Sequence, residues 1–340
     1  EIASCLVGSE MCIRDRGSSR SGTTMMGRIL GNHSDVFTFK ELHFFGTIWT
    51  NNSDKKLNRT EQVHLLSRLF CIQERGIFNQ NNFIEFKGKS EKILAEDISS
   101  PLKIYELFLE TISKENGSSI SCEQTPKNLY YLEEILDFFP DAKVINLVRD
   151  QRDVLLSQKN KWKRRFLGAK SIPMIEAIRS FVNYHPILTA KVWNSSLYQT
   201  SKFRSNSRVK IVKFEDLLVD SRIQVHEICK FLEIDFQENM LKVPVIGSST
   251  ENDSKSELVI DSSKISKWKK GGLTSSEIYL SQNLSSNMMD EFGYEKETFT
   301  FPPIMVVLHF ISFPFKLGLA FVLNYHRIGN VVEVIKKRVF

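Results

Sequence analysis

The feature that most constrains this chain is a short run of glycine, serine and threonine near its amino terminus. The residues G-S-S-R-S-G-T-T occupy Gly17–Thr24 and lead into a segment with helical character, Thr23–Asn32. Two glycines separated by four residues and followed by two hydroxyl side chains have the spacing of a phosphate-binding P-loop. In such a loop, backbone amides at the start of a helix surround an anion. The run therefore predicts an anion-binding loop, although a serine-rich turn before a helix is the alternative interpretation.

The loop departs from an ATP-binding P-loop at one position. Thr23 stands where such loops carry the lysine that spans the β- and γ-phosphates of ATP. Arg20 supplies a cation inside the loop instead, and its planar guanidinium suits bidentate contact with phosphate or sulfate oxygens. The sequence thus favours a shorter anion held without a metal over a triphosphate carried with Mg²⁺.

Short apolar runs alternate with longer helical patterns along the rest of the chain. The predicted strands are Val36–Phe39, Ile120–Glu123, Ala142–Val148 and Val209–Phe214. Helices are predicted around Glu61–Cys71, from Pro101 to Ile112, and over Asn128–Phe139, Asp150–Lys161, Asp216–Leu232 and Thr274–Asp290. This alternation indicates an α/β fold, a P-loop-NTPase-like parallel sheet flanked by helices on both faces.

A second candidate site lies in the segment L-V-R-D-Q-R-D-V-L-L-S-Q, Leu147–Gln158. Arg149 ends a predicted parallel strand, which is where ligands bind in open α/β sheets, and Ser157 lies two turns into the following helix. Together they can hold a phosphate through charge-assisted hydrogen bonds. Alone, the segment also fits a solvated helix start, with Asp150 and Asp153 stabilising the first turn.

The loop and the Arg/Ser pair, in this order, resemble the sulfotransferases that use 3′-phosphoadenosine 5′-phosphosulfate (PAPS), most closely the tyrosylprotein and bacterial branch. The resemblance covers a predicted domain at 17–295 and includes K-F-E-D-L-L-V-D-S (Lys213–Ser221) and K-W-K-K-G (Lys267–Gly271). It implies that the loop, through Arg20, Ser21, Gly22, Thr23 and Thr24, binds the 5′-phosphosulfate. It also implies that Arg149 and Ser157 bind the 3′-phosphate, that PAPS is the co-substrate, and that no metal is needed.

The same resemblance implies a catalytic base. In the tyrosylprotein branch a glutamate follows the loop arginine by 21 residues, the spacing of Arg20 and Glu41 here. Glu41 would accept the proton of an acceptor hydroxyl, with Arg20 as the catalytic cation, while His43 is the substitute base and a solvent-exposed Glu41 the alternative. One position departs from the family: Gln124 precedes Thr-Pro where a lysine is usual, and Lys127 follows three residues later.

The two ends of the chain are predicted to lie outside the catalytic domain. Residues 1–16 contain S-C-L-V-G-S-E-M-C-I-R-D-R, which looks like translated sequencing-adapter DNA, so we expect a non-native, irregular leader where the native first strand is missing or replaced. In the tail, 296–340, Ile304–Leu323 is apolar at 15 of 20 positions, and the basic, amphipathic His326–Phe340 follows it. These patterns predict a hydrophobic and amphipathic helical tail that contacts a membrane peripherally, or an arm packed on the domain.

Composition narrows the function further. A net charge of +6 among 86 charged residues is too mild for a duplex nucleic-acid binder. Five scattered cysteines without a C-x-x-C pair indicate reduced thiols in the cytoplasm, with the tail placing the protein at the cytoplasmic face of a membrane. We predict a PAPS-dependent sulfotransferase acting on a hydroxyl-bearing acceptor such as a glycan, lipid, small molecule or protein. The alternatives are a non-catalytic nucleotide-binding protein on this fold and a P-loop kinase.

Overall fold

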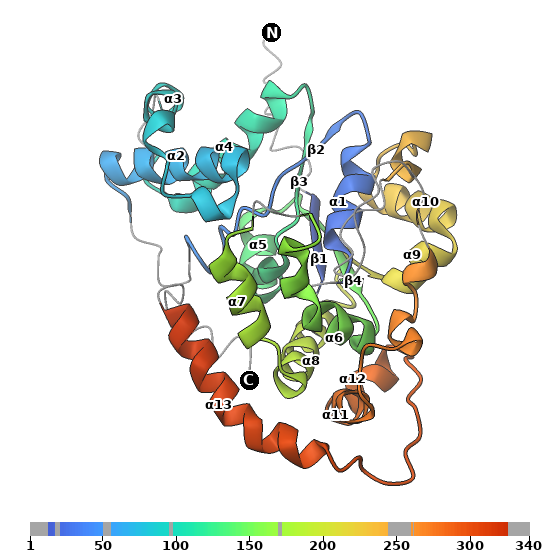
Figure 1. The fold of residues 1–340 in the computed structure, drawn as a ribbon. Coiled ribbons are helices and arrows are strands. Elements are labelled where there is room, and N and C mark those ends of the chain that lie inside the picture. Colours follow the sequence, from blue (N-terminus) through green and yellow to red (C-terminus); the bar gives the residue numbers. More distant parts are fainter. Residues whose placement is uncertain are drawn as a thin grey trace.

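A five-stranded parallel sheet forms the centre of the molecule, with its strands in the order β2-β3-β1-β4-β5 (Figure 1). The computed structural model describes residues 21–49, 56–94, 98–168, 172–243, 260 and 262–325, together with the backbone of 13–17. The strands are β1 (Ile13–Gly17), β2 (Val36–Thr38), β3 (Ile120–Glu123), β4 (Lys143–Val148) and β5 (Val209–Lys213). Every pairing is parallel, which confirms the predicted sheet.

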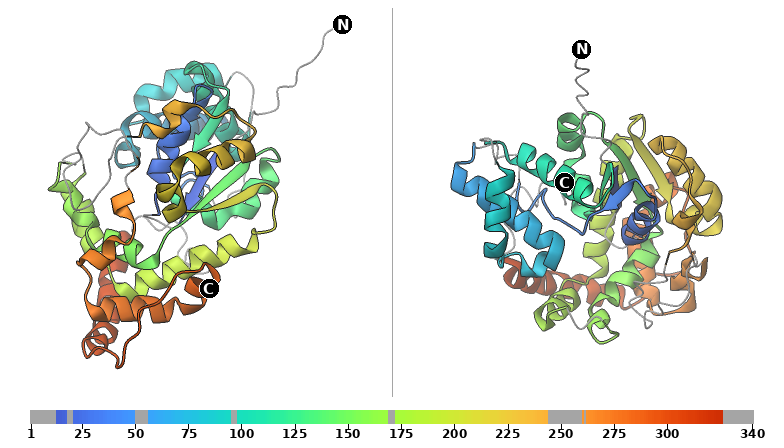
Figure 2. Two further views of the ribbon diagram at one scale, coloured as in Figure 1. Left: turned by 90° about the vertical axis from the view of Figure 1, so that its right-hand side faces the viewer. Right: turned by 90° about the horizontal axis from the view of Figure 1, so that it is seen from above.

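Helices cover both faces of this sheet and extend beyond it (Figures 1 and 2). The α-helices are α1 (Thr23–Gly31), α2 (Arg59–Arg75), α3 (Lys87–Ile93), α4 (Pro101–Glu115), α5 (Leu132–Phe138), α6 (Gln151–Lys159), α7 (Met174–Val182), α8 (Pro186–Lys202), α9 (Phe214–Val219), α10 (Ser221–Leu232), α11 (Ser275–Leu284), α12 (Ser286–Glu291) and α13 (Val306–Asn324). The 3₁₀ helices are η2 (Ile77–Asn79), η3 (Ile84–Phe86), η4 (Pro126–Tyr131), η5 (Lys161–Arg165), η6 (Glu238–Leu241), η7 (Ser262–Lys264) and η8 (Lys267–Lys270).

The side chains of β4 show how the two faces are covered. Ile145 and Leu147 point into a core built with α1 and α10, whereas Val144 and Val148 point into cores that include α5 and α8. Successive residues of a strand face opposite sides of its sheet, so a strand buried on both sides must be apolar throughout. Asn146, the one polar residue between Val144 and Val148, donates from Nδ2 to Thr200 Oγ1 of α8 at 2.6 Å.

Residues 13–17 correct one prediction. The first sixteen residues are expected to be irregular, yet Ile13–Gly17 forms the central strand β1, paired with β3 on one side and with β4 along its whole length. A vacant position between two strands would leave the backbone groups of both neighbours without partners, so this position must be filled by some segment. The origin of residues 1–16 as a non-native leader stays a prediction, and residues 1–12 lie outside those described.

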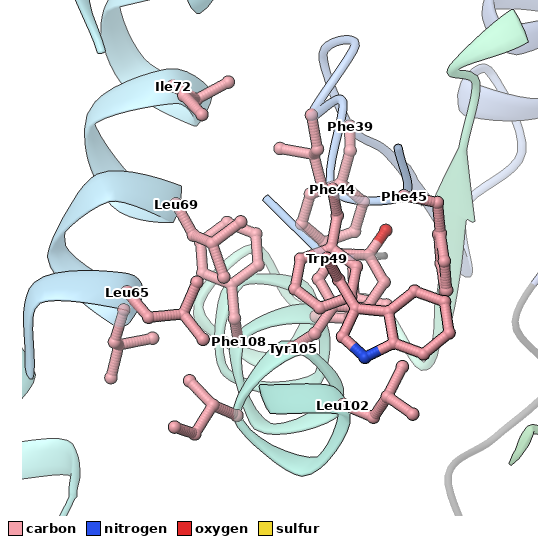
Figure 3. Close-up of a cluster of buried hydrophobic side chains, with 14 of the residues drawn as sticks. Phe39, Phe44, Phe45, Trp49, Leu65, Leu69, Ile72, Leu102, Tyr105 and Phe108 are labelled. Atoms are coloured by element: carbon pink, nitrogen blue, oxygen red, sulfur yellow. The ribbon is translucent and has the colours of Figure 1, made fainter. Parts of the chain in front are cut away.

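An aromatic core lies between α2, α4 and the segment that follows β2 (Figure 3). Phe44 stacks on Tyr105 of α4 with ring centroids 4.0 Å apart, and Phe45 meets the same ring edge-on. Phe39, Leu42, Phe44 and Phe45 have no exposed surface. This packing fixes the backbone on both sides of the polar residues between them, which include the candidate bases.

Two predicted helices are each divided into two in the structure, and some helices of the structure were not predicted. The predicted helix Asp216–Leu232 is two helices, because the Asp220 side chain accepts a hydrogen bond from Ile223 N and starts α10 anew. The segment Thr274–Asp290 likewise divides at Ser285 into α11 and α12. The helices α3, α7 and α8 were not predicted; in α8 the buried polar residues Ser196 and Thr200 interrupt the apolar pattern.

Candidate functional site

The predicted anion-binding loop leads from β1 into α1. Gly22 is the residue before the helix and has φ +103°, a backbone conformation that favours glycine. Ser21 and Thr23 are buried and Thr24 is exposed. The amides of the first helical turn have no acceptor within the helix, which makes this end of α1 suited to an anion. Arg20 lies outside the described residues, so its roles as anion ligand and catalytic cation stay predictions.

The ring of Phe214 joins this loop to Arg149. Phe214 follows β5 directly, and a Cβ atom added to Gly22 would lie 2.4 Å from its Cδ2 and Cε2 atoms. The guanidinium carbon of Arg149 lies over the same ring, 4.4 Å from the Phe214 ring centroid. Because β1 and β4 are neighbours, the loop and the strand-end arginine meet at the carboxyl edge of the sheet, as predicted.

Several contacts fix the position of Arg149. Its Nη2 donates to the carbonyl of Lys264 in η7 at 3.1 Å and lies 3.8 Å from Asp153 Oδ2, and its side chain is only 12% exposed. The Arg149 carbonyl accepts a hydrogen bond from Trp193 Nε1 at 3.0 Å. Burial raises the pKa of Asp153, and the Arg149 charge opposes that rise. The guanidinium is thus held in one orientation before any ligand arrives.

The late tryptophan segment packs on the start of α6. Trp268 N donates to Asp153 Oδ1 at 2.9 Å, and the Arg152 guanidinium lies 4.0 Å from the Trp268 ring centroid. Arg152 also pairs with Asp150 at 2.7 Å. The segment K-W-K-K-G is therefore brought against the helix that carries Ser157.

Ser157 lies half-buried on α6, one turn beyond Asp153. Two residues later, Lys159 Nζ pairs with Glu277 Oε2 of α11 at 2.8 Å, and Tyr184 donates to the other carboxylate oxygen at 2.5 Å. Burial would raise the pKa of Glu277, but the hydrogen bonds from Lys159, the Thr274 amide and Tyr184 outweigh it and lower the pKa. The ionised carboxylate of Glu277 therefore links α11 to the carboxyl-terminal end of α6, two residues after Ser157.

The two candidate bases lie side by side. His43 Nε2 is 3.2 Å from Glu41 Oε2, and their side chains are 17% and 45% exposed. His43 has φ +52°, which is uncommon for a residue other than glycine. Its backbone N–H donates to Thr125 Oγ1 at 3.2 Å. Sequence reasoning treats Glu41 and His43 as alternatives, whereas the structure pairs them.

A buried carboxylate supports the turn that holds His43. Glu123, at the end of β3, is fully buried and accepts hydrogen bonds from the Thr125 hydroxyl and from Asn128 Nδ2. The Thr125 hydroxyl oxygen in turn accepts a hydrogen bond from the His43 backbone N–H. The candidate bases are therefore attached to the carboxyl end of β3, the strand next to β1.

The position that departs from the family pattern is occupied by an anchored amide. Gln124 Nε2 donates to the Phe39 carbonyl at 3.0 Å, and a Cβ at Gly27 of α1 would lie 2.5 Å from Gln124 Oε1. Lys127, on η4, is half-buried. Gln124 thus fastens the chain after β2 to α1 and supplies no cation at this position.

The buried Phe214 and the half-buried Glu215, both at this edge, were not singled out for the site by sequence reasoning. The sequence places Phe214 only at the end of a predicted strand, and its place between Gly22 and Arg149 depends on long-range packing that no local pattern reports. Glu215 accepts hydrogen bonds from Asp150 N at 2.9 Å and from the Tyr294 hydroxyl at 3.0 Å. Burial raises the pKa of Glu215. A charged residue directly after a buried strand was the one signal available for it.

Comparison with known structures shows the same fold in sulfotransferases. The sulfotransferase domain from the curacin biosynthetic pathway matches with a TM-score of 0.52 and 19% identity, over 84% of this chain and 99% of that one. The sulfotransferase domain from the Synechococcus PCC 7002 olefin synthase matches with a TM-score of 0.48 and 20% identity, over 84% of this chain and 95% of that one.

Comparison of sequences finds an uncharacterized protein of Aquifex aeolicus strain VF5. It is 31% identical over 142 residues, which are 42% of this chain and 16% of that protein's length.

A helix-opening glycine loop beside a strand-end arginine, on a parallel sheet, defines a P-loop-like α/β protein. The sulfotransferase family model matches residues 16–238, well over half of the chain. The protein belongs to the sulfotransferase family.

Proposed function

We propose that this protein transfers a sulfuryl group from PAPS to an acceptor hydroxyl. The observation that carries the proposal is the contact of Phe214 with both Gly22 and Arg149. This contact places the start of α1 and the fixed guanidinium of Arg149 against one ring. Two separate anion sites at such close range suit a nucleotide that carries phosphate on both its 3′ and its 5′ oxygens.

The roles of the binding residues follow from this arrangement. The amides of Gly22, Thr23 and Thr24 would hold the 5′-phosphosulfate, with Ser21 and Arg20 completing the loop. Arg149 and Ser157 would hold the 3′-phosphate. The absence of a Cβ at Gly22 lets the Phe214 ring pack directly against the loop.

The proposed base is Glu41, with His43 as its positioning residue. Glu41 is the more exposed of the two and can reach an acceptor, while His43 is held by Thr125 and directs a ring nitrogen at the Glu41 carboxylate. As the acceptor oxygen bonds to sulfur, its proton passes to Glu41. The bond from sulfur to the 5′-phosphate oxygen breaks, and adenosine 3′,5′-bisphosphate leaves.

Nucleotide titration tests the proposal. Adenosine 3′,5′-bisphosphate should bind the intact chain much more tightly than adenosine 5′-monophosphate, because only the former reaches Arg149. Arg149→Ala should remove most of that difference. Each charge-assisted hydrogen bond contributes about 1.5–3 kcal/mol, or roughly 10- to 150-fold in affinity. Equal affinity of the unmodified protein for the two nucleotides would contradict the donor assignment.

Turnover needs a separate assay, because a non-catalytic protein on this fold would bind the nucleotide equally well. The intact chain is supplied with PAPS labelled in its sulfate group and with panels of glycan, lipid and small hydroxyl acceptors. Transfer of label to one class identifies the acceptor. Tight binding of the bisphosphate with no transfer to any panel would favour the non-catalytic alternative.

A further inference from the structure

The carboxyl-terminal helix α13 packs on the domain through its polar side. Its residues with hydrogen-bonding side chains form one stripe facing the domain, and each contacts it: His309 lies 3.3 Å from Ser276 Oγ, Ser312 3.4 Å from His185 Nε2, Lys316 Nζ 3.2 Å from the Tyr184 carbonyl, and Asn324 2.9 Å from Asn183 Oδ1. In Figure 1 the helix runs along the lower edge of the molecule, with α7 and α8 inside it. A helix that merely packs an apolar face on its domain would have the opposite orientation.

The outward side of α13 is almost entirely apolar. Its exposed residues are Val307, Leu308, Phe310, Ile311, Phe315, Leu317, Leu319, Phe321 and Val322, with exposed fractions from 44% to 76%. Among the described helices, α13 alone has the length and composition to cross a membrane. Its polar stripe is bound to the domain from His309 to Asn324, however, so the helix lies along the domain surface.

The neighbouring helix α7 also turns its polar residues towards the protein and its apolar residues outward. Its charged residues pair with each other, Arg179 Nη1 to Glu176 Oε1 at 2.5 Å, and Arg179 Nε donates to the Leu323 carbonyl of α13 at 3.0 Å. Its exposed apolar residues are Met174, Ile175, Ile178 and Phe181. Two adjacent helices that turn polar groups inward and apolar groups outward form one continuous surface, which we call the apolar face.

A basic and aromatic rim borders the apolar face. In η5, Trp162 packs edge-on against Phe181 of α7 at 5.9 Å and against Phe166 at 5.8 Å. The sequence of η5 is K-W-K-R-R, and residues 159–175 contain no acidic residue. Tryptophan and lysine or arginine beside an apolar surface are the side chains that favour the headgroup level of a membrane.

We propose that the apolar face, formed by α7 and α13 and bordered by η5, docks in the plane of a membrane that contains anionic lipid. A second copy of this chain is the other possible occupant, but apart from Glu176, which pairs with Arg179, α7, α13 and η5 contain no acidic residue that could pair with Lys161, Lys163, Arg164 and Arg165. Anionic headgroups instead complement these cations. The proposal is independent of the sulfuryl-transfer reaction, since it rests on no residue of the nucleotide site.

Vesicle sedimentation with the full chain tests the docking. The protein should sediment with vesicles of phosphatidylcholine and phosphatidylserine and less with phosphatidylcholine alone, and binding should weaken at high salt. Lys163→Gln with Arg164→Gln should reduce the affinity for the anionic vesicles by roughly 25-fold, about fivefold for each charge. Unchanged binding of that variant would overturn the role given to the basic rim.

A matched pair of substitutions tests the apolar face itself. Ile311 on α13 and Ile223 on α10 are both 57% exposed, and α10 lies away from α13 in Figures 1 and 2. Ile311→Glu should lower vesicle binding at least tenfold, while Ile223→Glu, with the same change in charge, should leave it within about twofold. Equal effects of the two substitutions would show that α13 does not enter the membrane.

A fluorescence measurement separates membrane docking from self-association. Trp49, Trp193 and Trp268 are at most 5% exposed, so quenching by lipids with brominated acyl chains should report mainly Trp162 and should disappear in Trp162→Phe. Absence of vesicle binding by the unmodified chain would overturn the proposal. A chain that is dimeric without lipid, becomes monomeric in Ile311→Glu and ignores vesicles would instead assign the face to a second copy.

Discussion

Replacing Gly22 by alanine should reveal how tightly the anion-binding loop is packed on Phe214. The new Cβ would lie 2.4 Å from two ring carbons, far inside ordinary contact distance. The backbone there has φ +103°, which strains any residue with a side chain at a cost of about 1–3 kcal/mol. Overpacking a close contact adds about 1–3 kcal/mol. We therefore expect Gly22→Ala to lower the free energy of unfolding by about 2–6 kcal/mol.

Gly76→Ala provides a control at a positive φ without the clash. Gly76 also has a positive φ, +80°, but a Cβ there meets nothing within 4 Å. It should therefore show the backbone strain without the clash, about 1–3 kcal/mol. Denaturant unfolding of the two variants gives the difference, which we expect to be about 1–3 kcal/mol and to come from the Phe214 ring.

A double-mutant cycle isolates the contact. In a Phe214→Ala background the side-chain carbons that clash are absent, so Gly22→Ala should cost no more than Gly76→Ala costs in the unmodified chain. Because the ring also supports Arg149, Gly22→Ala should weaken binding of adenosine 3′,5′-bisphosphate by about tenfold, or 1.4 kcal/mol. Equal costs for Gly22→Ala and Gly76→Ala in the unmodified chain would refute the packing of the loop on Phe214.

Glu41→Gln should lower kcat by roughly 10²–10⁴-fold with little change in nucleotide affinity, and His43→Ala should lower it less; the reverse order in steady-state kinetics would make the histidine the base. In calorimetric titrations of adenosine 3′,5′-bisphosphate, Ser157→Ala should weaken binding less than Arg149→Ala, and equal losses would contradict the assigned roles. A chelator should leave transfer unchanged, and complete loss of activity would favour the kinase. Burial, with the nearby histidine and lysine of α13, lowers the pKa of His185 to about 4. The unfolded chain therefore binds more protons, so stability should fall as pH drops from about 6.5 towards 4, with a weaker slope in His185→Gln.

The sequence alone predicts the fold because local patterns encode it. The glycine spacing of the loop and the apolar runs of β4 and β5 locate the strand ends. A strand buried on both faces needs an apolar run, and Arg149 directly after such a run falls at the carboxyl edge of the sheet. The same reasoning misjudged β1, whose residues I-R-D-R-G lack an apolar pattern, because backbone pairing between two strands does not depend on one.

Contacts between segments distant in the sequence determine how the site residues are arranged and which side of α13 faces the domain. The place of Phe214 between Gly22 and Arg149 follows from strand order, which joins β5 to β4 and β4 to β1. The pairing of Glu41 with His43 depends on a turn held by Thr125, which lies just beyond the end of β3. Composition identified α13 as apolar, but which side of a helix is buried depends on the groups that face it, and only the tertiary structure supplied polar partners for its polar stripe.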